Sequence, residues 1–373
     1  MRDADLLIAL DYYSPYVSGL TNVARDVAVG LVERGHRVRV IAGQHDRSLP
    51  LSEELDGVRV DRVPVVARLG KGLISPALVP RVLQATRTSA VTHLHLPMPE
   101  AGPIALRAHS PLVVTYHCDV SLPPGLVNRV QGAVMDASSR TALRRADRVV
   151  VTSDDYAEHS RVWPAMAGRT TVIPPPCHVR PAGRPRFRDG AGLHVGFLGR
   201  IVEEKGLQYL VRAFQQLGDP DARLLIGGDF AAVAGGSVVE EVRQLAAGDA
   251  RIRFLGFLPD EDIADLYASI DVFALPSVNA FEAFGIVQVE AMMAGVPALA
   301  SDLPGVRTPV QETGFGVIAT PRDVPGIAAG LAQLRTAGLD RAAGARRARE
   351  RYAQSTVLDG YEQVLADLTG RPA

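Results

Sequence analysis

The sequence predicts an α/β protein with two doubly wound domains, each built around a parallel sheet. Short runs of β-branched residues alternate with longer runs whose apolar residues recur at helical spacing, as in successive β–α–β units. A proline-rich stretch at residues 174–188 interrupts this alternation, which then starts again. The length of 373 residues suits about two to three domains of ordinary size.

The first half of the chain predicts one such domain over residues 1–175. The apolar run 6–10 predicts a strand, and residues 20–31 repeat apolar side chains at helical spacing up to Gly35, a typical helix stop. Helical segments separate most of the strands, so right-handed crossovers would place them in a parallel sheet covered on both faces. Further strands are expected at 38–42, 58–63, 91–96, 112–116, 149–152 and 171–173.

The second half predicts another domain of similar size. Residues 174–188 hold five prolines and few apolar side chains, so we expect a semi-rigid linker over 176–190. The second domain should span 191–354, and a C-terminal helix over about 355–373 should pack back on the first domain. Strands are expected at 193–198, 223–226, 252–255, 272–275 and 296–300, and helices at 207–217 and 238–247.

The composition excludes several classes of protein. Apolar residues make up 47% of the chain and charged residues 22%, which fits a globular core rather than disorder. A net charge of −1 gives no basic footprint, so no nucleic-acid partner is expected. Cys118 and Cys177, the only cysteines, cannot build a disulfide framework or a four-thiolate zinc site. The N-terminal apolar run is too short for a signal peptide and no run reaches about 18 residues, so we expect a cytoplasmic protein.

Three loops carry the residues that predict chemistry. The first, residues 13–22, lies between the first strand and the first helix and contains Gly19. A loop of small residues there lets backbone amides at a helix N-terminus approach an anion, although an ordinary β–α turn has the same composition. The Gly-x-Gly-x-x-Gly fingerprint of dinucleotide-binding proteins is missing, which argues against a nicotinamide enzyme.

The second loop, residues 196–206, holds one of the two lysines of the chain. Of the 40 basic residues only Lys71 and Lys205 are lysines, a bias that base composition explains. Arg200 and Lys205 flank the turn into the next helix, so two cations and a helix N-terminus would form a clamp for a diphosphate. The alternative is a surface loop in which both cations pair with the neighbouring glutamates.

The third loop, residues 277–290, contains two carboxylates eight positions apart. Glu282 falls in the loop after a strand, and Glu290 lies about two turns into the following helix. The residues between them, 283–287, supply free backbone amides at the helix start. Glu290 has apolar neighbours on both sides, so its carboxylate needs a specific hydrogen-bond donor.

His93 and His95 alternate along a predicted strand and therefore point the same way. A two-histidine metal pair is one interpretation, although no third ligand stands nearby in the sequence. The other interpretation is a pair of side chains that line the core or a cleft.

Together these segments resemble the retaining glycosyltransferases of family 4, which have the GT-B fold. The resemblance covers nearly the whole chain and implies two Rossmann-like domains that face each other across a cleft. It is most specific over 193–305. It rests on Gly199-Arg200, Glu204-Lys205-Gly206, Phe254-Leu-Gly-Phe-Leu258, Ala268-Ser-Ile-Asp271, the Glu-x7-Glu motif of 282–290 with Ala-Met-Met-Ala-Gly-Val-Pro297 after it, and the histidine loop Thr115-Tyr-His-Cys-Asp119.

The resemblance implies that the second domain binds a nucleotide-diphosphate sugar. Arg200 and Lys205 are expected to hold the diphosphate. Glu290 is expected to bind the ribose hydroxyls and Glu282 the hydroxyls of the donor sugar, with the base near Gly256. Further donor contacts are expected from the backbone amides of Ala283, Phe284, Gly285, Ile286 and Val287.

In the first domain the resemblance implies two further site residues. His117 is expected beside the donor sugar near the reacting carbon, and Gly19 lets its loop approach the diphosphate and the acceptor. Ser18 and Leu20 flank Gly19, whereas many family members have a pair of glycines here. This departure affects the contacts that the loop is expected to make with the diphosphate and the acceptor. The side chains expected to act in the reaction are His117, Arg200, Lys205 and Glu282.

The implied reaction is transfer of a hexosyl group from UDP-, GDP- or another NDP-hexose to an acceptor hydroxyl, with retention at the anomeric carbon. Arg200 and Lys205 would take the place of a metal ion, so neither a metal nor another cofactor is expected. No carboxylate nucleophile stands out, which favours front-face substitution in which the departing phosphate takes the acceptor proton. The alternatives are a nucleotide-sugar 2-epimerase-type enzyme on the same fold and a non-catalytic nucleotide-sugar-binding protein.

The acceptor side is expected in the first domain. Glycan, lipid-linked and small-molecule acceptors all fit the resemblance. Segment 67–88 mixes basic and apolar residues in a region that belongs to the acceptor side in the family. Peripheral contact with a membrane surface is therefore one interpretation of this segment.

Overall fold

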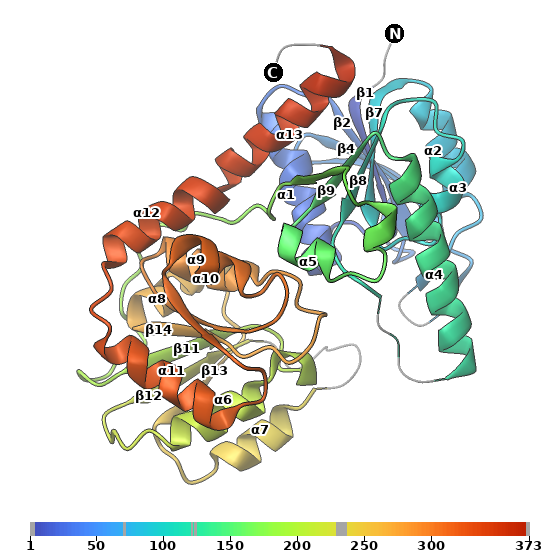
Figure 1. The fold of residues 1–373 in the computed structure, drawn as a ribbon. Helices are drawn as coiled ribbons and strands as arrows, with labels where there is room; N and C mark the ends of the chain where they lie inside the picture. Colours follow the sequence, from blue (N-terminus) through green and yellow to red (C-terminus); the bar gives the residue numbers. More distant parts are fainter. Residues whose placement is uncertain (1–3, 70–71, 121, 123–124, 229–236, 371–373) are drawn as a thin grey trace. The chain divides into compact units, whose positions relative to one another are not determined.

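The computed structural model describes residues 4–69, 72–120, 122, 125–228 and 237–370, which form two compact units (Figure 1). The N-terminal unit comprises Met1–Pro176 together with Gln354–Ala373, and the C-terminal unit comprises Cys177–Ala353. Lys71 lies outside the described residues. None of the helices in the described part of the chain has the length and hydrophobicity needed to cross a membrane.

The N-terminal unit is built around an eight-stranded sheet in the order β10-β9-β8-β7-β1-β2-β4-β3. All neighbours are parallel except β3 and β4, and β5 pairs with β6 in a separate antiparallel hairpin. The predicted strands are present, whereas β3, β5 and β6 are too short to show a periodic pattern. The strands are β1 (Ala4–Leu10), β2 (Val38–Gln44), β3 (Ser52–Leu55), β4 (Val58–Pro64), β5 (Ala67–Leu69), β6 (Gly72–Ile74), β7 (Ser89–Leu96), β8 (Leu112–Tyr116), β9 (Arg148–Val151) and β10 (Thr170–Val172).

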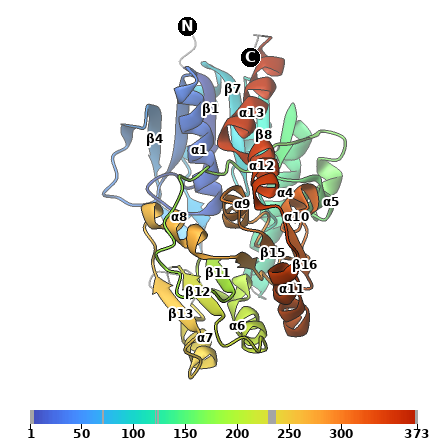
Figure 2. The same cartoon turned by 90° about the vertical axis from the view of Figure 1, so that its left-hand side faces the viewer.

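Helices cover both faces of this sheet. α1 (Gly19–Glu33) and α13 (Gln354–Thr369) lie side by side on one face (Figure 2). The C-terminal helix is held there because Arg34 donates to Asp359 at 2.7 Å. The other face carries α2 (Leu78–Thr86), α3 (Ala101–Ala105) and α4 (Leu126–Arg145), while α5 (Asp154–Glu158) and the 3-10 turn η1 (Trp163–Ala165) follow β9.

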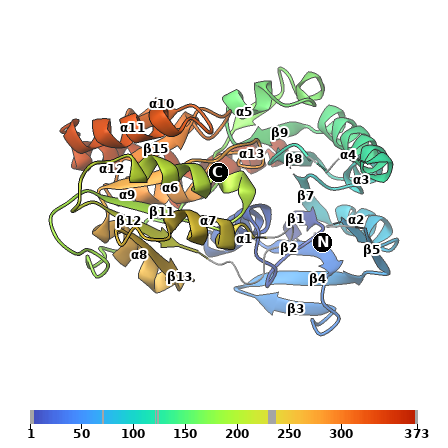
Figure 3. The same ribbon diagram turned by 90° about the horizontal axis from the view of Figure 1, so that it is seen from below.

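The C-terminal unit has a six-stranded sheet, parallel throughout, in the order β13-β12-β11-β14-β15-β16. Its strands are β11 (His194–Leu198), β12 (Arg223–Gly227), β13 (Ile252–Gly256), β14 (Val272–Leu275), β15 (Ala298–Ser301) and β16 (Gly316–Ala319). One apolar cluster joins the sheet to α6 (Leu207–Gln215), α7 (Val239–Ala246) and α11 (Val324–Thr336). A second cluster joins it to α8 (Asp260–Ser269), α9 (Ile286–Met293), α10 (Thr308–Thr313) and α12 (Arg341–Tyr352), so both faces are covered (Figure 3).

The parallel register brings the predicted site loops to one edge of each sheet. In the N-terminal unit Leu10, the last residue of β1, pairs with Ala42, two residues before the end of β2, and Leu96 and Tyr116 pair at the ends of β7 and β8. In the C-terminal unit Leu198 at the end of β11 pairs with Gly227 at the end of β12. Ligands of doubly wound sheets bind beyond such carboxyl ends.

Candidate functional site

Two loops of the C-terminal unit are held together by close backbone contacts. The 3-10 turn η2 (Glu203–Lys205) after β11 lies against the loop after β14, where the Val278 N–H donates to the Glu204 carbonyl at 2.9 Å. Gly206 follows the turn at φ 64°, and a Cβ there would lie 2.1 Å from the Pro276 carbonyl oxygen. Glycine permits this approach, which brings the predicted diphosphate loop against the predicted sugar loop.

Lys205 and Glu282, which are predicted to bind different parts of the donor, contact each other directly. Lys205 Nζ donates a hydrogen bond to Glu282 Oε2, and both side chains are mostly buried. Arg200 makes a different contact, because its 53% exposed side chain pairs with Glu204 at 3.4 Å. Pairing with a glutamate of the same loop, the alternative for both cations, therefore holds for Arg200 and not for Lys205.

A row of backbone amides follows Glu282 in the chain. Gly285 takes φ 86°, so α9 begins only at Ile286, and Glu290 lies about one turn into the helix rather than two as predicted. N–H groups at a helix start suit an anion because they carry partial positive charge. In the described part of the chain, no acceptor takes a hydrogen bond from the N–H groups of Ala283, Phe284, Gly285, Ile286 and Val287.

Glu290 has the hydrogen-bond donors that its apolar surroundings require. Its side chain is 5% exposed, and Oε2 accepts from Arg180 Nε at 2.9 Å. The Tyr267 hydroxyl lies 3.4 Å from Oε2 and shares its single proton between this oxygen and the Val287 carbonyl at 3.1 Å. Burial, reinforced by the Glu290 charge, raises the pKa of Tyr267 well above its usual range, so this hydroxyl stays protonated and donates. Both donors contact Oε2, which leaves Oε1 for a ligand.

Arg180 contacts the predicted site residue Glu290, although the sequence does not single it out. It belongs to the proline-rich segment and is fixed a second time by Asp260, whose Oδ1 accepts from Nη1 at 2.9 Å. The apolar neighbours of Glu290 predict that some donor exists, but several arginines of the segment would serve equally. Only the fold shows which of them reaches α9.

Gly256 ends β13 in the left-handed region at φ 74°, and its carbonyl accepts from the Gly228 N–H at 2.8 Å. A Cβ placed on Gly256 would meet no atom within 4 Å. The space beside this glycine is thus unfilled by the described chain. Its predicted place beside the base stays a prediction.

In the N-terminal unit three histidines form a buried ladder. The rings of His93 and His95 are 4.2 Å apart and those of His95 and His117 are stacked at 5.1 Å. His93 Nε2 lies 2.7 Å from Thr115 Oγ1, and His95 Nδ1 lies 2.9 Å from His117 Nε2. The first two histidines do point the same way, but these nitrogens engage Thr115 and His117. No group of three or more His, Cys, Asp or Glu side chains in the described residues is placed to hold a metal.

Burial fixes both the charge and the tautomer of this ladder. It lowers the pKa of His117 to about 4 and that of His95 well below the usual range, so both imidazoles are neutral at pH 7. His95 Nε2 is buried and has no partner among the described residues. A buried N–H without an acceptor costs about 1–3 kcal/mol, so the proton of His95 sits on Nδ1 and is donated to His117 Nε2. His117 must then carry its own proton on Nδ1, which makes no hydrogen bond to the described residues.

Gly19 is the first residue of α1 and follows its N-cap, Ser18, whose Oγ accepts from the Thr21 N–H at 3.1 Å. A Cβ on Gly19 would meet no atom within 4 Å. The packing of the described chain therefore does not itself require glycine at this position. The contact of Gly19 with diphosphate and acceptor stays a prediction.

Two carboxyl groups that the sequence does not connect meet at the same edge. Asp11 follows β1 and Glu100 precedes α3, and Asp11 Oδ1 and Glu100 Oε2 are both buried without a hydrogen-bond partner among the described residues. Burial and then the charge of Glu100 raise the pKa of Asp11 well above its usual value. The pair therefore retains a proton to a higher pH than isolated carboxyls do. The two residues are 89 positions apart, so only the strand order brings them together.

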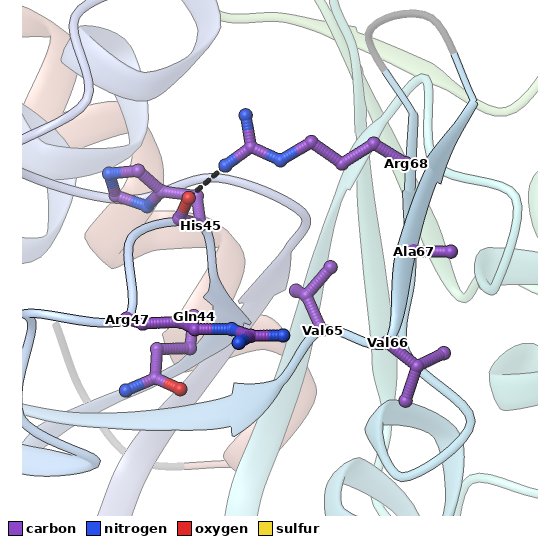
Figure 4. A pocket seen from close by; sticks show the side chains of 7 residues that line it. All are labelled: Gln44, His45, Arg47, Val65, Val66, Ala67 and Arg68. Carbon is purple, nitrogen blue, oxygen red and sulfur yellow. Dashed lines mark hydrogen bonds between the residues drawn. The ribbon is translucent and has the colours of Figure 1, made fainter.

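A pocket of about 160 Å³ opens where β2 ends (Figure 4). Figure 4 shows Arg68 reaching towards His45, and its guanidinium donates a hydrogen bond to the His45 carbonyl. The His45 ring lies 5.5 Å from that of Tyr16, in the loop after β1, which places the pocket beside that loop. The pocket is lined by Gln44, His45, Arg47, Val65, Val66, Ala67 and Arg68.

Comparison with known proteins identifies both halves of the chain. The model described as "Glycosyl transferases group 1" matches residues 188–351, and that described as "Glycosyl transferase 4-like domain" matches residues 18–176. A D-inositol 3-phosphate glycosyltransferase of Xylanimonas cellulosilytica is 30% identical over 93% of this chain and 92% of its own. A phosphatidyl-myo-inositol mannosyltransferase of Mycobacterium leprae is 32% identical over 81% and 79%, respectively. A 2-deoxystreptamine glucosyltransferase of Streptomyces kanamyceticus is 32% identical over 61% and 62%.

Solved structures share the architecture. Sucrose-phosphate synthase from Thermosynechococcus elongatus matches with a TM-score of 0.78 at 21% identity, over 98% of this chain and 99% of its own. Anabaena HepE, solved with UDP and glucose, matches with a TM-score of 0.69 at 20% identity, over 98% and 100%. At such low identity these likenesses speak for the fold, and they agree with the matched family models. The chain therefore belongs to family 4 of the glycosyltransferases: it is a glycosyltransferase with the GT-B fold.

Proposed function

We propose that this glycosyltransferase moves a hexosyl group from a nucleotide-diphosphate sugar to an acceptor hydroxyl, with retention and without a metal. One observation carries the donor assignment: Lys205 and Glu282 are paired next to five amides that have no acceptor in the described chain. A diphosphate would give the amides and Lys205 the negative charge that suits them, and a sugar would give Glu282 hydroxyl donors. Donor binding would thus replace the ion pair between Lys205 and Glu282 by contacts of Lys205 and the amides with the diphosphate and of Glu282 with the sugar hydroxyls.

The same residues explain how the leaving group would be stabilised. As the bond from the sugar to the phosphate breaks, negative charge grows on the diphosphate. Lys205 and the amides of the α9 start already stand at fixed positions, so little reorganisation is needed when the charge develops. Arg200, tied to Glu204 by a half-exposed contact, can exchange this weak pair for phosphate. These donors are an ammonium, a guanidinium and amides, which suit phosphate directly and are not metal ligands.

Glu290 is proposed to bind the ribose. Arg180 and Tyr267 hold Oε2, and a carboxylate fixed in this way presents Oε1 to a pair of hydroxyls without losing rotamer entropy on binding. Arg180 is then a positioning residue that acts through Glu290.

His117 is proposed to donate its Nδ1 proton to an oxygen of the donor sugar. A neutral imidazole can do so without adding a charge beside the anomeric centre, where positive charge develops. Burial raises the pKa values of Asp11 and Glu100, so this carboxyl pair tends to hold a proton instead of serving as an anionic nucleophile, and front-face substitution with the departing phosphate as the base is therefore proposed.

The pocket after β2 favours an acceptor that carries negative charge. Arg47 and Arg68 line it, and Arg47 has no carboxylate partner in the described part of the chain. Two guanidinium groups attract a phosphate and repel an amine. Of the acceptors named for the relatives, D-inositol 3-phosphate therefore suits this pocket better than 2-deoxystreptamine, a diamine.

The reaction is tested by incubating the protein with UDP-glucose or GDP-mannose and each of these acceptors, with and without a chelator, and following the anomeric proton by NMR. We expect an acceptor-dependent product with the donor's anomeric configuration and an unchanged rate in chelator. An inverted product, or a rate abolished by chelator and restored by metal, would contradict the mechanism. An epimerised sugar formed without acceptor would identify an epimerase, and tight donor binding without turnover a binding protein.

A further inference from the structure

One arginine of the N-terminal unit is buried on an apolar face of β4. Arg62 follows Val58 and Val60 on the same face of this strand, and both valines are fully buried. The side chain of Arg62 is itself 0% exposed. A guanidinium stays charged in proteins, so its burial requires partners for its N–H groups. The partners of Arg62 therefore show which segments depend on it.

The guanidinium of Arg62 connects two loops that are distant in the sequence. Nη2 donates to the Ser14 carbonyl at 2.8 Å, in the loop of residues 11–18 that follows β1. Nη1 donates to the Pro50 carbonyl at 3.0 Å, in the loop of residues 45–51 that follows β2. We call these segments the β1 loop and the β2 loop. They are thus held to each other through one buried side chain.

The planar guanidinium of an arginine suits this connection. Nη1 also forms an ion pair with Glu53 of β3, so a carboxylate offsets the buried charge while the two carbonyls take the other hydrogen bonds. A lysine ammonium is a single point of charge and could not span the same acceptors. Among the described residues, Nε of Arg62 has no partner. The binding capacity of the side chain is therefore used mainly to join these three segments.

The two loops also meet through aromatic rings beside the acceptor pocket. The ring of Tyr16 in the β1 loop lies 5.5 Å from that of His45 in the β2 loop and 4.2 Å from that of Tyr12. His45 and Arg47 of the β2 loop line the pocket (Figure 4). The place of these pocket residues thus depends on how the two loops are held together, and Arg62 holds them from the buried side.

We propose that Arg62 is a positioning residue for the acceptor, which holds the β2 loop to the β1 loop so that the pocket keeps its shape. The inference rests on the proposed function, because the pocket is assigned to the acceptor there. Arg62 does not itself line the pocket, so it acts through His45 and Arg47. A pocket whose loops are fixed in advance loses less conformational entropy when it binds a ligand.

The expected donor contacts do not depend on Arg62. Gly19 starts α1, and this helix start is capped by Ser18. Thr21 Oγ1 adds a hydrogen bond to the Tyr12 carbonyl at 3.4 Å. None of these contacts involves Arg62, and the proposed diphosphate site lies in the C-terminal unit. Loss of Arg62 should therefore weaken acceptor binding and leave nucleotide binding unchanged.

The test uses Arg62→Met and a matched control, Arg39→Met. The three residues that accept from Arg62 are each partly or fully exposed, so water can satisfy them in Arg62→Met and the variant should fold. Arg39 is also buried, with a side chain 8% exposed, and pairs with Asp61 of the same sheet. It stands near the start of β2, at the opposite end from the β2 loop. Circular dichroism checks that both variants are folded.

Amide hydrogen exchange tests the connection between the loops without any substrate. The N–H groups of Tyr16 and Leu49 each donate to a carbonyl of their own loop, at 3.2 and 3.1 Å. In Arg62→Met both amides should exchange about tenfold faster or more, because a loop without this contact opens more often. In Arg39→Met they should exchange as in the wild type. Unchanged exchange of both amides in Arg62→Met overturns the proposal.

Kinetics and calorimetry then test the effect on the acceptor. With D-inositol 3-phosphate as the acceptor, Arg62→Met should raise the acceptor KM by about tenfold or more, the scale for one lost charge-assisted hydrogen bond. UDP and GDP should bind to it as to the wild type. Arg62→Lys keeps the charge and part of the contacts, so its KM should fall between the two. A smaller folded fraction alone would lower the apparent kcat and leave KM unchanged, which separates positioning from stability.

Two results of these measurements overturn the proposal. One is an equal acceptor KM in Arg62→Met and Arg39→Met. The other is a loss of nucleotide affinity in Arg62→Met as large as the rise in acceptor KM, since Arg62 would then support the unit as a whole. Absence of transfer by the wild type would contradict the proposed function instead, and the exchange rates would still decide whether Arg62 holds the loops.

Discussion

The carboxyl edges of the two sheets differ in how they hold titratable side chains. At the C-terminal edge the groups are charged and paired, Lys205 with Glu282 and Arg180 with Glu290. At the N-terminal edge burial suppresses charge: it lowers the pKa of His117 to about 4, so that this imidazole is neutral, and with the Glu100 charge it raises the pKa of Asp11, so that the carboxyl pair retains a proton. Paired charges can be exchanged for those of a phosphate, whereas a neutral imidazole or a protonated carboxyl can only donate or accept hydrogen bonds. This contrast fits a C-terminal unit that binds a diphosphate and an N-terminal unit that forms hydrogen bonds with hydroxyl groups.

The largest effect is expected where the C-terminal edge loses its cation. Lys205→Ala should lower kcat by about tenfold to a thousandfold, the range for loss of one group that stabilises developing charge. Arg200→Ala should fall at the lower end of this range, because Arg200 is half exposed. Steady-state kinetics with a saturating donor measures both.

Arg335→Ala is the matched control for Arg200→Ala. Arg335 is 51% exposed against 53% for Arg200, and each pairs with one carboxylate of the same unit. A general loss of surface charge would lower turnover equally in the two variants. Near-wild-type turnover in both Lys205→Ala and Arg200→Ala would contradict the proposal that these two cations bind the diphosphate.

The next largest effect is expected on stability, from the buried ion pair between Arg180 and Glu290 at the same edge. Arg180→Ala leaves Glu290 buried with only the Tyr267 hydroxyl at Oε2, and breaking a buried ion pair from one side typically costs about 3 kcal/mol of unfolding free energy. Chemical denaturation of the wild type and the variant measures this difference. Glu290→Gln removes the charge and keeps the shape, so it should cost less stability while weakening nucleotide binding. An Arg180→Ala variant as stable as the wild type would show that the pair does not fix Glu290.

The sequence predicts the fold and the donor loops because these depend on local patterns. Strand and helix periodicity, the linker and the Glu-x7-Glu motif can be seen in single segments, and Gly206 and Gly285 take the backbone conformations that bring those segments together. Arg180, the Asp11–Glu100 pair and the His95–His117 hydrogen bond depend on contacts between distant segments, so no spacing predicts them. The later start of α9 depends on the φ angle of Gly285, which the sequence permits but does not require.

At the N-terminal edge the sharpest prediction concerns the tautomer of His117. In the wild type, long-range proton–nitrogen NMR should show the proton of His117 on Nδ1, because His95 donates to Nε2. His95→Phe removes this donor and should populate the other tautomer, with a loss of turnover of about tenfold or less, the worth of one neutral hydrogen bond. His159→Gln, at an exposed histidine of the same unit, should leave the His117 signals unchanged. A proton on Nε2 in the wild type would contradict the assignment.

The smallest effect is expected from the carboxyl pair. Because the folded pKa of Asp11 is raised, the folded chain retains a proton that the unfolded chain loses above its ordinary pKa of 3.8. The stability that this proton confers is therefore present at acidic pH and declines as the pH rises through the folded pKa. Asp11→Asn cannot titrate, so its unfolding free energy should fall less between pH 4 and pH 8 than that of the wild type. Parallel denaturation curves across this range would show that the two carboxyls are not coupled.

We infer that the paired charges of the C-terminal edge form the binding site for a nucleoside diphosphate. Calorimetric titration of UDP and of GDP into the wild type and into Lys205→Ala tests it most directly, without knowledge of sugar or acceptor. We predict that the wild type binds at least one of them and that Lys205→Ala binds it about tenfold or more weakly, the loss expected for one charge-assisted contact. Equal affinity of the two proteins, or no binding of either nucleotide by the wild type, would contradict the claim.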